Sequence, residues 1–311
     1  ADGSISAAGE PVVLTAAGKA APVAIGPSAV GDVGTAVVFN PATNRVDEVS
    51  TTFDSDSNKV VVVYADATNS FNGYAVVGTV SGTSISYGTP VAFETADTVN
   101  HTSCTFDSDS NKVVIAYRDH NNSYYGTAIV GTVSGTAISF GTAVVFDSSG
   151  WTSFSTTTFD SNENKVVIVY QDYNGVVPNY QGHAIVGTVS GTSISFGTEV
   201  IFNAGSASEA FSATFDSDSN KVVVAYSDGG NSYHGTAIVG TVSGTAISFG
   251  SEAVFAAAST DKIGATFDSD SNKVVIGYRD KDNSNYGTGI VGTVSGTSIS
   301  FGTEVVFETA D

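Results

Sequence analysis

The sequence TFDSDSNKVVVVY, residues 52–64, decides the fold because it returns four more times with few changes. Its phenylalanine falls at Phe53, Phe106, Phe159, Phe215 and Phe267, in steps of 53, 53, 56 and 52 residues. A fixed period of this size in a β-rich sequence indicates propeller blades or a solenoid. Each period is therefore expected to fold as one supersecondary unit.

Every period contains four candidate strands, which the second one illustrates. A short run of small residues (103–106) is followed by a continuously apolar run (112–117), as expected for a strand covered on both faces. The next strand (127–133) leads through a Ser-Gly hairpin into a stretch that bends at Gly141 (137–146). Four hairpin-joined strands predict an all-β protein, a β-propeller of four-stranded blades.

The expected number of blades is five, with six as the alternative. The units lie near 34–88, 89–141, 142–197, 198–250 and 251–311, and residues 1–33 form a short β or extended tether used for attachment. Residues 34–39 (GTAVVF) look like the closing segment of a unit, and residues 307–311 (FETAD) repeat residues 93–97. Either the N-terminal strand closes the ring with the final unit, or the chain is a segment of a longer array.

Composition and charge narrow the function classes. Val, Ile, Thr, Phe and Tyr dominate, while Leu occurs once, at Leu14, so β-structure is favoured over helix. The formal charge of −20 disfavours nucleic acid as a partner. No apolar run is long enough for membrane insertion. The lone Cys104 cannot form an internal disulfide and is interpreted as a small buried residue.

The acidic loop inside the repeat has two interpretations. Asp54, Asp56 and Asn58 alternate as the first ligands of a calcium loop do, and the other repeats carry equivalents. However, Lys59 stands where that loop needs Gly, and no Glu follows at its twelfth position. We favour a tight turn in which the side chains cap their own backbone, and we expect no cofactor; calcium is the alternative.

The repeats differ from one another at one end only. The acidic loop and the Val-Ser-Gly-Thr hairpin are nearly constant, and in a blade both emerge on the same side. The connections between second and third strands, and those between units, vary and emerge on the opposite side. Variable loops on a rigid scaffold are where recognition usually occurs.

Aspartates and aromatic residues recur in these variable loops. Such groups suit a carbohydrate pocket, in which carboxylates accept sugar hydroxyls and flat rings stack on the sugar. The competing interpretation is that each Asp caps its own loop, which we favour for the Asp ring; Trp151, Tyr173 and Tyr124 are the stronger candidates. The candidate ligand-binding residues are Trp151, Tyr124, Tyr125, Tyr173, Tyr180, Tyr233, Tyr286, Asp66, Asp119, Asp172, Asp228 and Asp280.

An enzyme is not expected. A glycoside hydrolase needs two carboxylates in unlike environments, whereas equivalent residues around a ring share one. Glu48, Glu94 and Glu209 break the repeat, but nothing marks a pair among them. Motifs of zinc proteases, serine hydrolases and phosphate-binding loops do not occur, so no catalytic residue is assigned.

The repeats TAIVGTVSGTAISFGTAVVF (127–146) and TFDSDSNKVVIAYRD (105–119), with GEPVVLTAAGKAAPVA (9–24), resemble tandem repeats of bacteriophage tail-fibre or receptor-binding proteins, notably marine ones. The resemblance spans nearly the whole chain and rests on the repeat pattern. It implies an extracellular, virion-surface role in which the N-terminal segment attaches to another virion protein and the propeller faces a host-surface glycan or receptor. It carries over no binding residues. A secreted or cell-surface bacterial lectin or adhesin, a decoration protein without ligand, and a homo-oligomer remain alternatives.

Overall fold

The computed structural model describes residues 12–14, 20–22, 34–40, 45–96, 98–173, 175, 180–205 and 208–308, with the backbone alone for 12–14, 20–22 and 208–210. The chain divides into two compact units, Ala1–Val37 with Ser81–Ser84, and Val38–Val80 with Ile85–Asp311. In the first unit β1 (Val12–Leu14) pairs antiparallel with β2 (Ala20–Pro22). The rest of the expected N-terminal tether lies outside the described residues.

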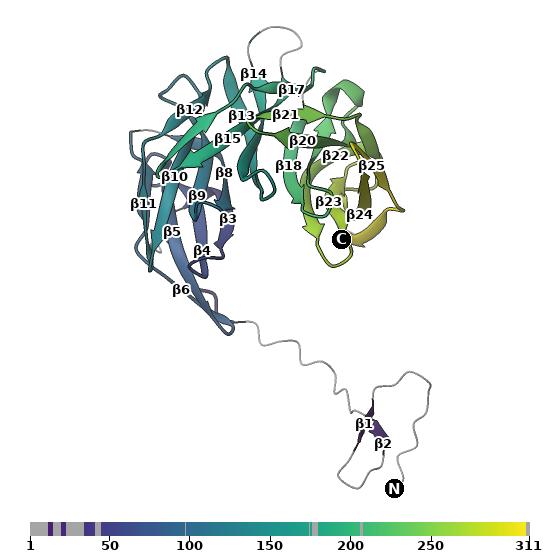
Figure 1. Cartoon of the computed structure of the whole chain (residues 1–311), viewed down its shortest axis with the longest axis horizontal. Coiled ribbons are helices and arrows are strands. Elements are labelled where there is room, and N and C mark those ends of the chain that lie inside the picture. Colours follow the sequence, from purple (N-terminus) through teal and green to yellow (C-terminus); the bar gives the residue numbers. More distant parts are fainter. Residues whose placement is uncertain are drawn as a thin grey trace. The chain divides into compact units, whose positions relative to one another are not determined.

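The second unit repeats one antiparallel sheet five times within the described residues (Figure 1). In each repeat three long strands lie in sequence order, and two further segments pair with the third. In the fourth repeat the second of these segments is the start of the 16-residue β22 (Ala253–Asp268), which continues as the first strand of the fifth repeat. These two repeats therefore form one nine-stranded sheet, whose halves are named the fourth and fifth sheets below. In the second sheet the two segments are β11 (Ala137–Phe140) and β12 (Val144–Asp147), which pair with opposite ends of β10. The predicted all-β class and four-stranded antiparallel units are therefore confirmed, including the break after Phe140.

The strands of the five sheets, in chain order, have the following bounds. The first sheet contains β3 (Val46–Asp54), β4 (Lys59–Asp66), β5 (Asn72–Ser81), β6 (Ser84–Tyr87) and β7 (Val91–Glu94). The second begins with β8 (Val99–Asp107), β9 (Lys112–Asp119) and β10 (Tyr125–Ser134). The third contains β13 (Trp151–Asp160), β14 (Lys165–Tyr173), β15 (Gln181–Ser190), β16 (Ser193–Phe196) and β17 (Val200–Asn203). The fourth and fifth contain β18 (Ser208–Asp216), β19 (Lys221–Asp228), β20 (His234–Ser243), β21 (Ala246–Phe249), β22 (Ala253–Asp268), β23 (Lys273–Asp280), β24 (Tyr286–Ser295), β25 (Ser298–Phe301) and β26 (Val305–Glu308).

The continuously apolar second strand is explained by burial on both sides. In β9, Val113 and Ile115 pack in one core cluster with residues of the first sheet. Their neighbours Val114 and Ala116 point the other way and pack in a second cluster with the third sheet. Because successive side chains of a strand alternate between faces, a strand between two sheets must be apolar at every position.

Neighbouring sheets are joined by a repeated aromatic contact. The phenylalanine near the end of one sheet packs against the second-strand tyrosine of the next sheet and against an aromatic residue of its fourth strand. Phe93 lies 5.3 Å from Tyr117 and 5.9 Å from Phe140, measured between ring centroids. The same contact joins Phe146 to Tyr170 and Phe196, Phe202 to Tyr226 and Phe249, and Phe255 to Tyr278 and Phe301.

The first strands lie side by side around one axis. The Ser50 hydroxyl accepts a hydrogen bond from the amide of Cys104 (3.1 Å), and the Ser103 hydroxyl accepts one from the amide of Thr157 (3.0 Å). The Thr and Phe residues at the ends of all five first strands line one cavity of about 430 Å³. A linear stack of coils would not bring the first and fifth repeats to one cavity, so the repeats curve around it.

Cys104 has the structural role expected of it. Its side chain is buried between the first two sheets, and its Sγ lies 3.4 Å from the Ser50 hydroxyl. Burial raises the pKa of the Cys104 thiol to about 12, so the reactive thiolate is scarce at neutral pH. No helix among the described residues is long and apolar enough to cross a membrane.

We expect the aromatic contact between sheets to carry much of the stability. Phe255→Ala should lower the free energy of unfolding by about 3–5 kcal/mol, because Phe255 is only 4% exposed and its removal leaves a cavity. The measurement is urea denaturation followed by tryptophan fluorescence. Phe307→Ala is the matched control, since Phe307 holds the same position in the fifth sheet but is 68% exposed; its cost should stay below about 1 kcal/mol. Equal losses in the two variants would contradict this assignment.

Candidate functional site

The variable ends of the second, third and fourth sheets bring several aromatic residues together. Trp151 begins β13 and pairs across the sheet with Tyr173, the last residue of β14. Tyr124 and Tyr233 occupy equivalent positions just before β10 and β20, both with positive φ (65° and 60°). In this backbone conformation the loop turns sharply within two residues, which places the ring at the end of the sheet.

Four of these rings form a continuous row. The Tyr124 ring lies 4.8 Å from Trp151, Trp151 lies 5.5 Å from Tyr173, and Tyr173 stacks on Tyr180 at 4.9 Å. Trp151 nevertheless remains 49% exposed. A row of packed but accessible rings is a rigid apolar surface whose faces are available for stacking.

A pocket of about 410 Å³ opens beside this row. It is lined by His101, Trp151, Ser153, Phe154, Gln171, Tyr173, Tyr180 and Tyr233, which come from the second, third and fourth sheets. A second pocket of about 370 Å³ shares Trp151 and Tyr173 and adds Ser123, Tyr125, Ser148, Ser149, Gly150 and Gly175. Flat rings with a few hydroxyl and amide groups between them are the composition expected of a small-molecule site.

Four residues of the first pocket were not among the sequence-based candidates, namely His101, Ser153, Phe154 and Gln171. His101 and Phe154 each lie at a β-bulge of a first strand and have positive φ, 52° and 49°, and the two rings are 4.9 Å apart. Glu48 and Lys262 occupy the same bulge position in the first and fifth sheets. A signal was present in the sequence, because the residue five positions before the repeated Phe differs in every repeat. Bulges redirect side chains, which explains why this position faces the pocket.

Two ionisable residues, His101 and Arg118, lie next to the pocket; His101 is kept neutral by burial, and Arg118 is held by hydrogen bonds. Burial lowers the pKa of His101 to about 4, and the Arg118 charge adds to this effect. Arg118 donates to the Ser153 hydroxyl and to the Asn100 side chain, both at 3.2 Å, and its guanidinium lies 5.6 Å from the Tyr124 ring centroid. A cationic group thus lies at the edge of the pocket in a chain of net charge −20.

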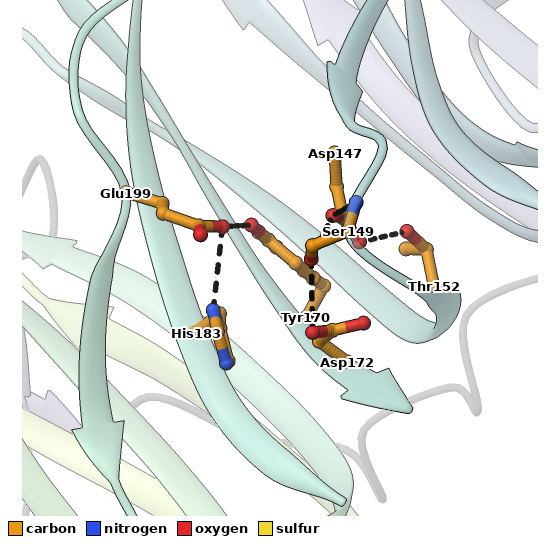
Figure 2. Close-up of polar contacts among 7 residues, drawn as sticks. All are labelled: Asp147, Ser149, Thr152, Tyr170, Asp172, His183 and Glu199. Atoms are coloured by element: carbon orange, nitrogen blue, oxygen red, sulfur yellow. Dashed lines mark hydrogen bonds and ion pairs between the residues drawn. The ribbon is translucent and has the colours of Figure 1, made fainter. Parts of the chain in front are cut away.

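A polar cluster of mostly buried side chains includes the sequence neighbours of two rings of the row (Figure 2). The Thr152 hydroxyl donates to Asp147 (2.7 Å), and the Ser149 hydroxyl bonds both Asp147 (2.7 Å) and Asp172 (3.0 Å). Burial, followed by the Asp147 charge, raises the pKa of the Asp172 carboxyl. Because Thr152 and Asp172 adjoin Trp151 and Tyr173 in sequence, this cluster fixes the two rings.

The same cluster contains a tyrosine–glutamate pair. The Tyr170 hydroxyl donates to Glu199 at 2.7 Å, and His183 Nδ1 lies 3.4 Å from the same carboxylate oxygen, which lowers the pKa of Glu199. Tyr226 and Glu252 form an equivalent pair at 2.7 Å in the fourth sheet. Because the same pair occurs in two successive repeats, we interpret it as part of the packing of the repeat.

Four of the five predicted aspartates accept hydrogen bonds from their own loops, whereas Asp172 accepts from Ser149 of the preceding connection. Asp66 accepts hydrogen bonds from the amide (3.0 Å) and hydroxyl (2.7 Å) of Thr68, and Asp228 accepts from the amide of Gly230 at 2.9 Å. Asp280 and Asp119 likewise accept from amides of their loops, at 3.0 and 3.3 Å. These contacts agree with the capping interpretation, and a role of the aspartates in ligand binding stays a prediction.

The remaining candidates lie apart from the first pocket. Tyr125 lines the second pocket, and Tyr286 lines neither. The side chain of Glu209 lies outside the described part of the chain.

In the acidic loop, Asp54 accepts from the amides of Asp56 (3.0 Å) and Ser57 (2.9 Å), and Asn58 has φ 55°, so the loop is a capped turn. No group of three His, Cys, Asp or Glu side chains in the described ranges is arranged to hold a metal ion.

Comparisons with known proteins identify the fold. No protein-family model matches the sequence, and no curated protein matches it. A protein of unknown function from Dyadobacter fermentans has a similar structure, with TM-score 0.59, 10% identity and coverage of 82% of this chain and 81% of that one. AofleA from Arthrobotrys oligospora has TM-score 0.51, 11% identity and coverage of 83% and 73%. The intramolecular trans-sialidase from Ruminococcus gnavus has TM-score 0.54, 10% identity and coverage of 90% and 89%. These similarities and the curved row of four-stranded sheets indicate a β-propeller fold.

The neutral state of His101 can be tested by titration. We expect the imidazole to titrate in NMR spectra with a pKa of about 4. This value is below the unfolded value of about 6.5, so the unfolded chain takes up the proton first, and the free energy of unfolding falls as the pH is lowered between these values. His101→Asn, which tolerates positive φ, should flatten that part of the stability profile. A pKa near 6.5 would show that His101 is solvated.

The turn interpretation of the acidic loop predicts unequal roles for its carboxylates. Asp107 is buried and accepts from the amides of Asp109 and Ser110, so Asp107→Ala should lower the free energy of unfolding by about 1–3 kcal/mol. Asp109→Ala, at an exposed position of the same loop, is the matched control and should be nearly neutral. Melting with calcium and with chelator completes the test. If calcium raised the melting midpoint of the original chain but not that of either variant, the loop would be a metal site instead.

Proposed function

We propose that this protein is a carbohydrate-binding module, in which a β-propeller scaffold presents the pocket beside Trp151 to a cell-surface glycan. The observation that supports this best is the row of rings Tyr124, Trp151, Tyr173 and Tyr180 at the edge of a pocket with hydroxyl and amide groups. In this proposal the scaffold consists of five blades from this chain. A trans-sialidase among the similar structures is consistent with a carbohydrate ligand, although identity is only 10%.

The chemistry of the pocket suits a sugar. One face of a pyranose ring presents C–H groups that pack on an aromatic plane, and its hydroxyls need hydrogen-bonding groups at the rim. Trp151 and Tyr180 supply exposed rings, whereas Ser153 and Gln171 supply polar groups to the lining of the pocket. Arg118, bonded to Ser153, adds a positive charge that would favour a sugar carrying an acidic group.

The polar cluster around Asp147 and Asp172 favours a binding protein over a glycosidase. The carboxylates Asp147, Asp172 and Glu199 accept hydrogen bonds from Ser149, Thr152 and Tyr170. None of the three lines the pocket beside Trp151. A glycosidase needs its acid and its nucleophile or base on either side of the scissile bond. We therefore infer that these groups hold the pocket in shape.

The biological setting extends this proposal. On the basis of the repeat resemblance, we infer a phage tail-fibre or receptor-binding protein on the virion surface, with residues 1–33 joining another virion protein and the variable side facing the host. The aromatic pocket favours a binding role over a decoration protein without ligand. The same pocket would serve a secreted or cell-surface bacterial lectin, so finding the protein in purified virions is the observation that selects the phage role.

Ligand binding should depend on the aromatic row. Trp151→Ala and Tyr180→Ala should each weaken glycan binding about tenfold or more, because each removes a stacking plane of the pocket. A glycan array identifies the ligand, and calorimetry measures its affinity. Tyr286→Ala is the matched control, since this tyrosine lies before β24 in the fifth sheet and lines neither pocket. Undiminished binding in the Trp151 and Tyr180 variants, or turnover of the bound glycoside, would contradict the proposal.

A further inference from the structure

The fifth sheet exposes a face that is buried in every other sheet. Val275 is 37% exposed and Val291 46% exposed, whereas their equivalents in the fourth sheet, Val223 and Val239, are fully buried. Phe307, at the position of the inter-sheet aromatic contact, is also exposed. In the first three sheets the equivalent valines, Val61, Val77, Val114, Val130, Val167 and Val186, are likewise fully buried.

The four interfaces between successive sheets show which contacts cover this face in the other sheets. The glycine after the fourth strand approaches the carbonyl oxygen of the threonine in the next sheet's hairpin, so that an added Cβ at Gly250 would lie 1.9 Å from the Thr297 oxygen. Gly88, Gly141 and Gly197 meet Thr136, Thr192 and Thr245 in the same way. Gly302, the equivalent in the fifth sheet, meets no such threonine.

Two glycines on the exposed face of the fifth sheet also leave room for another backbone to approach closely. Gly277 and Gly289 stand where the fourth sheet has Ala225 and Ala237. A Cβ at Gly277 would meet nothing within 4 Å, and one at Gly289 would meet its first neighbour only at 3.7 Å. Glycine inside a strand costs stability and often marks a place where another backbone comes near.

Residues 34–40 show the other side of the same interface. The Phe39 ring lies 5.2 Å from Tyr64 and 5.9 Å from Tyr87, which is the contact that Phe93 makes with the second sheet. Within the N-terminal unit, a Cβ at Gly34 would lie 1.7 Å from the Thr83 oxygen, as at the other repeat glycines. These residues therefore occupy the place of the last segment of a sheet that precedes the first one. Their sequence, GTAVVF, is identical to residues 141–146, which close the second repeat.

We propose that the exposed face of the fifth sheet binds a sixth sheet of this same repeat, and that residues 34–40 are the last segment of that sheet. The sixth sheet would place its second-strand tyrosine on Phe307 and its hairpin threonine on Gly302. The four interfaces already present define this partner, since each covers the same valines with the same residue types. A second whole copy, face to face, fits less well, because it would oppose the exposed Glu304 and Glu308 to themselves.

The proposal can be tested with a chain that is extended by one more repeat of its own sequence. Residues 307–311 repeat residues 93–97, so a second copy of residues 98–140 joined after Asp311 continues the repeat without a change of sequence. Followed in space by residues 34–39, it rebuilds a complete unit identical to residues 98–146. We expect the extended chain to melt about 5 °C or more above the original and to lose binding of a dye specific for exposed apolar surface.

The contact with Phe307 supplies the control. Phe307→Ala should remove most of the gain in the extended chain, although it costs little in the original one, and this difference measures the interaction directly. An extended chain with unchanged melting and dye binding overturns the proposal. So does an original chain that dimerises in light scattering and becomes monomeric on Phe307→Asp, since the occupant is then a second copy. If the extended chain does not fold, residues 98–140 are added to the original chain as a separate peptide, and the absence of saturable dye displacement counts against the proposal.

Discussion

The structure depends on one constraint, that a β-sheet with apolar residues on both faces needs a neighbour on each side. The second strands of the repeats, such as β9, have no polar residue between Val113 and Tyr117, so neither face can be left in water at little cost. Stacking identical units satisfies this requirement for all inner sheets at once. The hydroxyl bonds between first strands, such as Ser50 to Cys104, draw one edge of each sheet toward a common axis, and the stack curves as a result.

This arrangement separates stability from recognition. Residues that hold the stack together lie on the faces of the sheets, where the aromatic contacts of Phe93, Phe146, Phe202 and Phe255 repeat with nearly the same geometry. Residues at the variable ends touch few groups of the core and differ from sheet to sheet. The pocket beside Trp151 arises where three such ends meet, and the buried cluster around Asp147 and Asp172 connects it to the rigid part.

Much of the fold could be predicted from the sequence because the repeat supplies five parallel readings of one pattern. The apolar run before Tyr117, the Ser-Gly hairpin and the break after Phe140 all follow from local rules. The aromatic residues Trp151, Tyr173, Tyr180 and Tyr233 could also be placed near one another, since equivalent loops of adjacent sheets must be neighbours. His101 and Phe154 could not, because a β-bulge shifts the register by one residue and redirects a side chain that strict alternation would assign elsewhere. The repeats at residues 34–39 and 307–311 indicated an incomplete unit, but the exposure of Val275, Val291 and Phe307 on the outer face of the fifth sheet could be seen only in the structure.

The bulge itself has a consequence for how such a chain can change. Its backbone is held by the neighbouring first strand, since the Thr102 hydroxyl donates to the Glu48 carbonyl and the Ser155 hydroxyl to the His101 carbonyl. The acceptors of these bonds are main-chain oxygens, and at the first bulge the Glu48 carboxylate also accepts from the His101 amide (2.9 Å). Glutamate, histidine, phenylalanine and lysine all occupy this conformation in a single molecule. This bulge position, which contributes His101 and Phe154 to the pocket, therefore accommodates side chains of different size and charge, so that exchange of single residues can change the ligand that one scaffold binds.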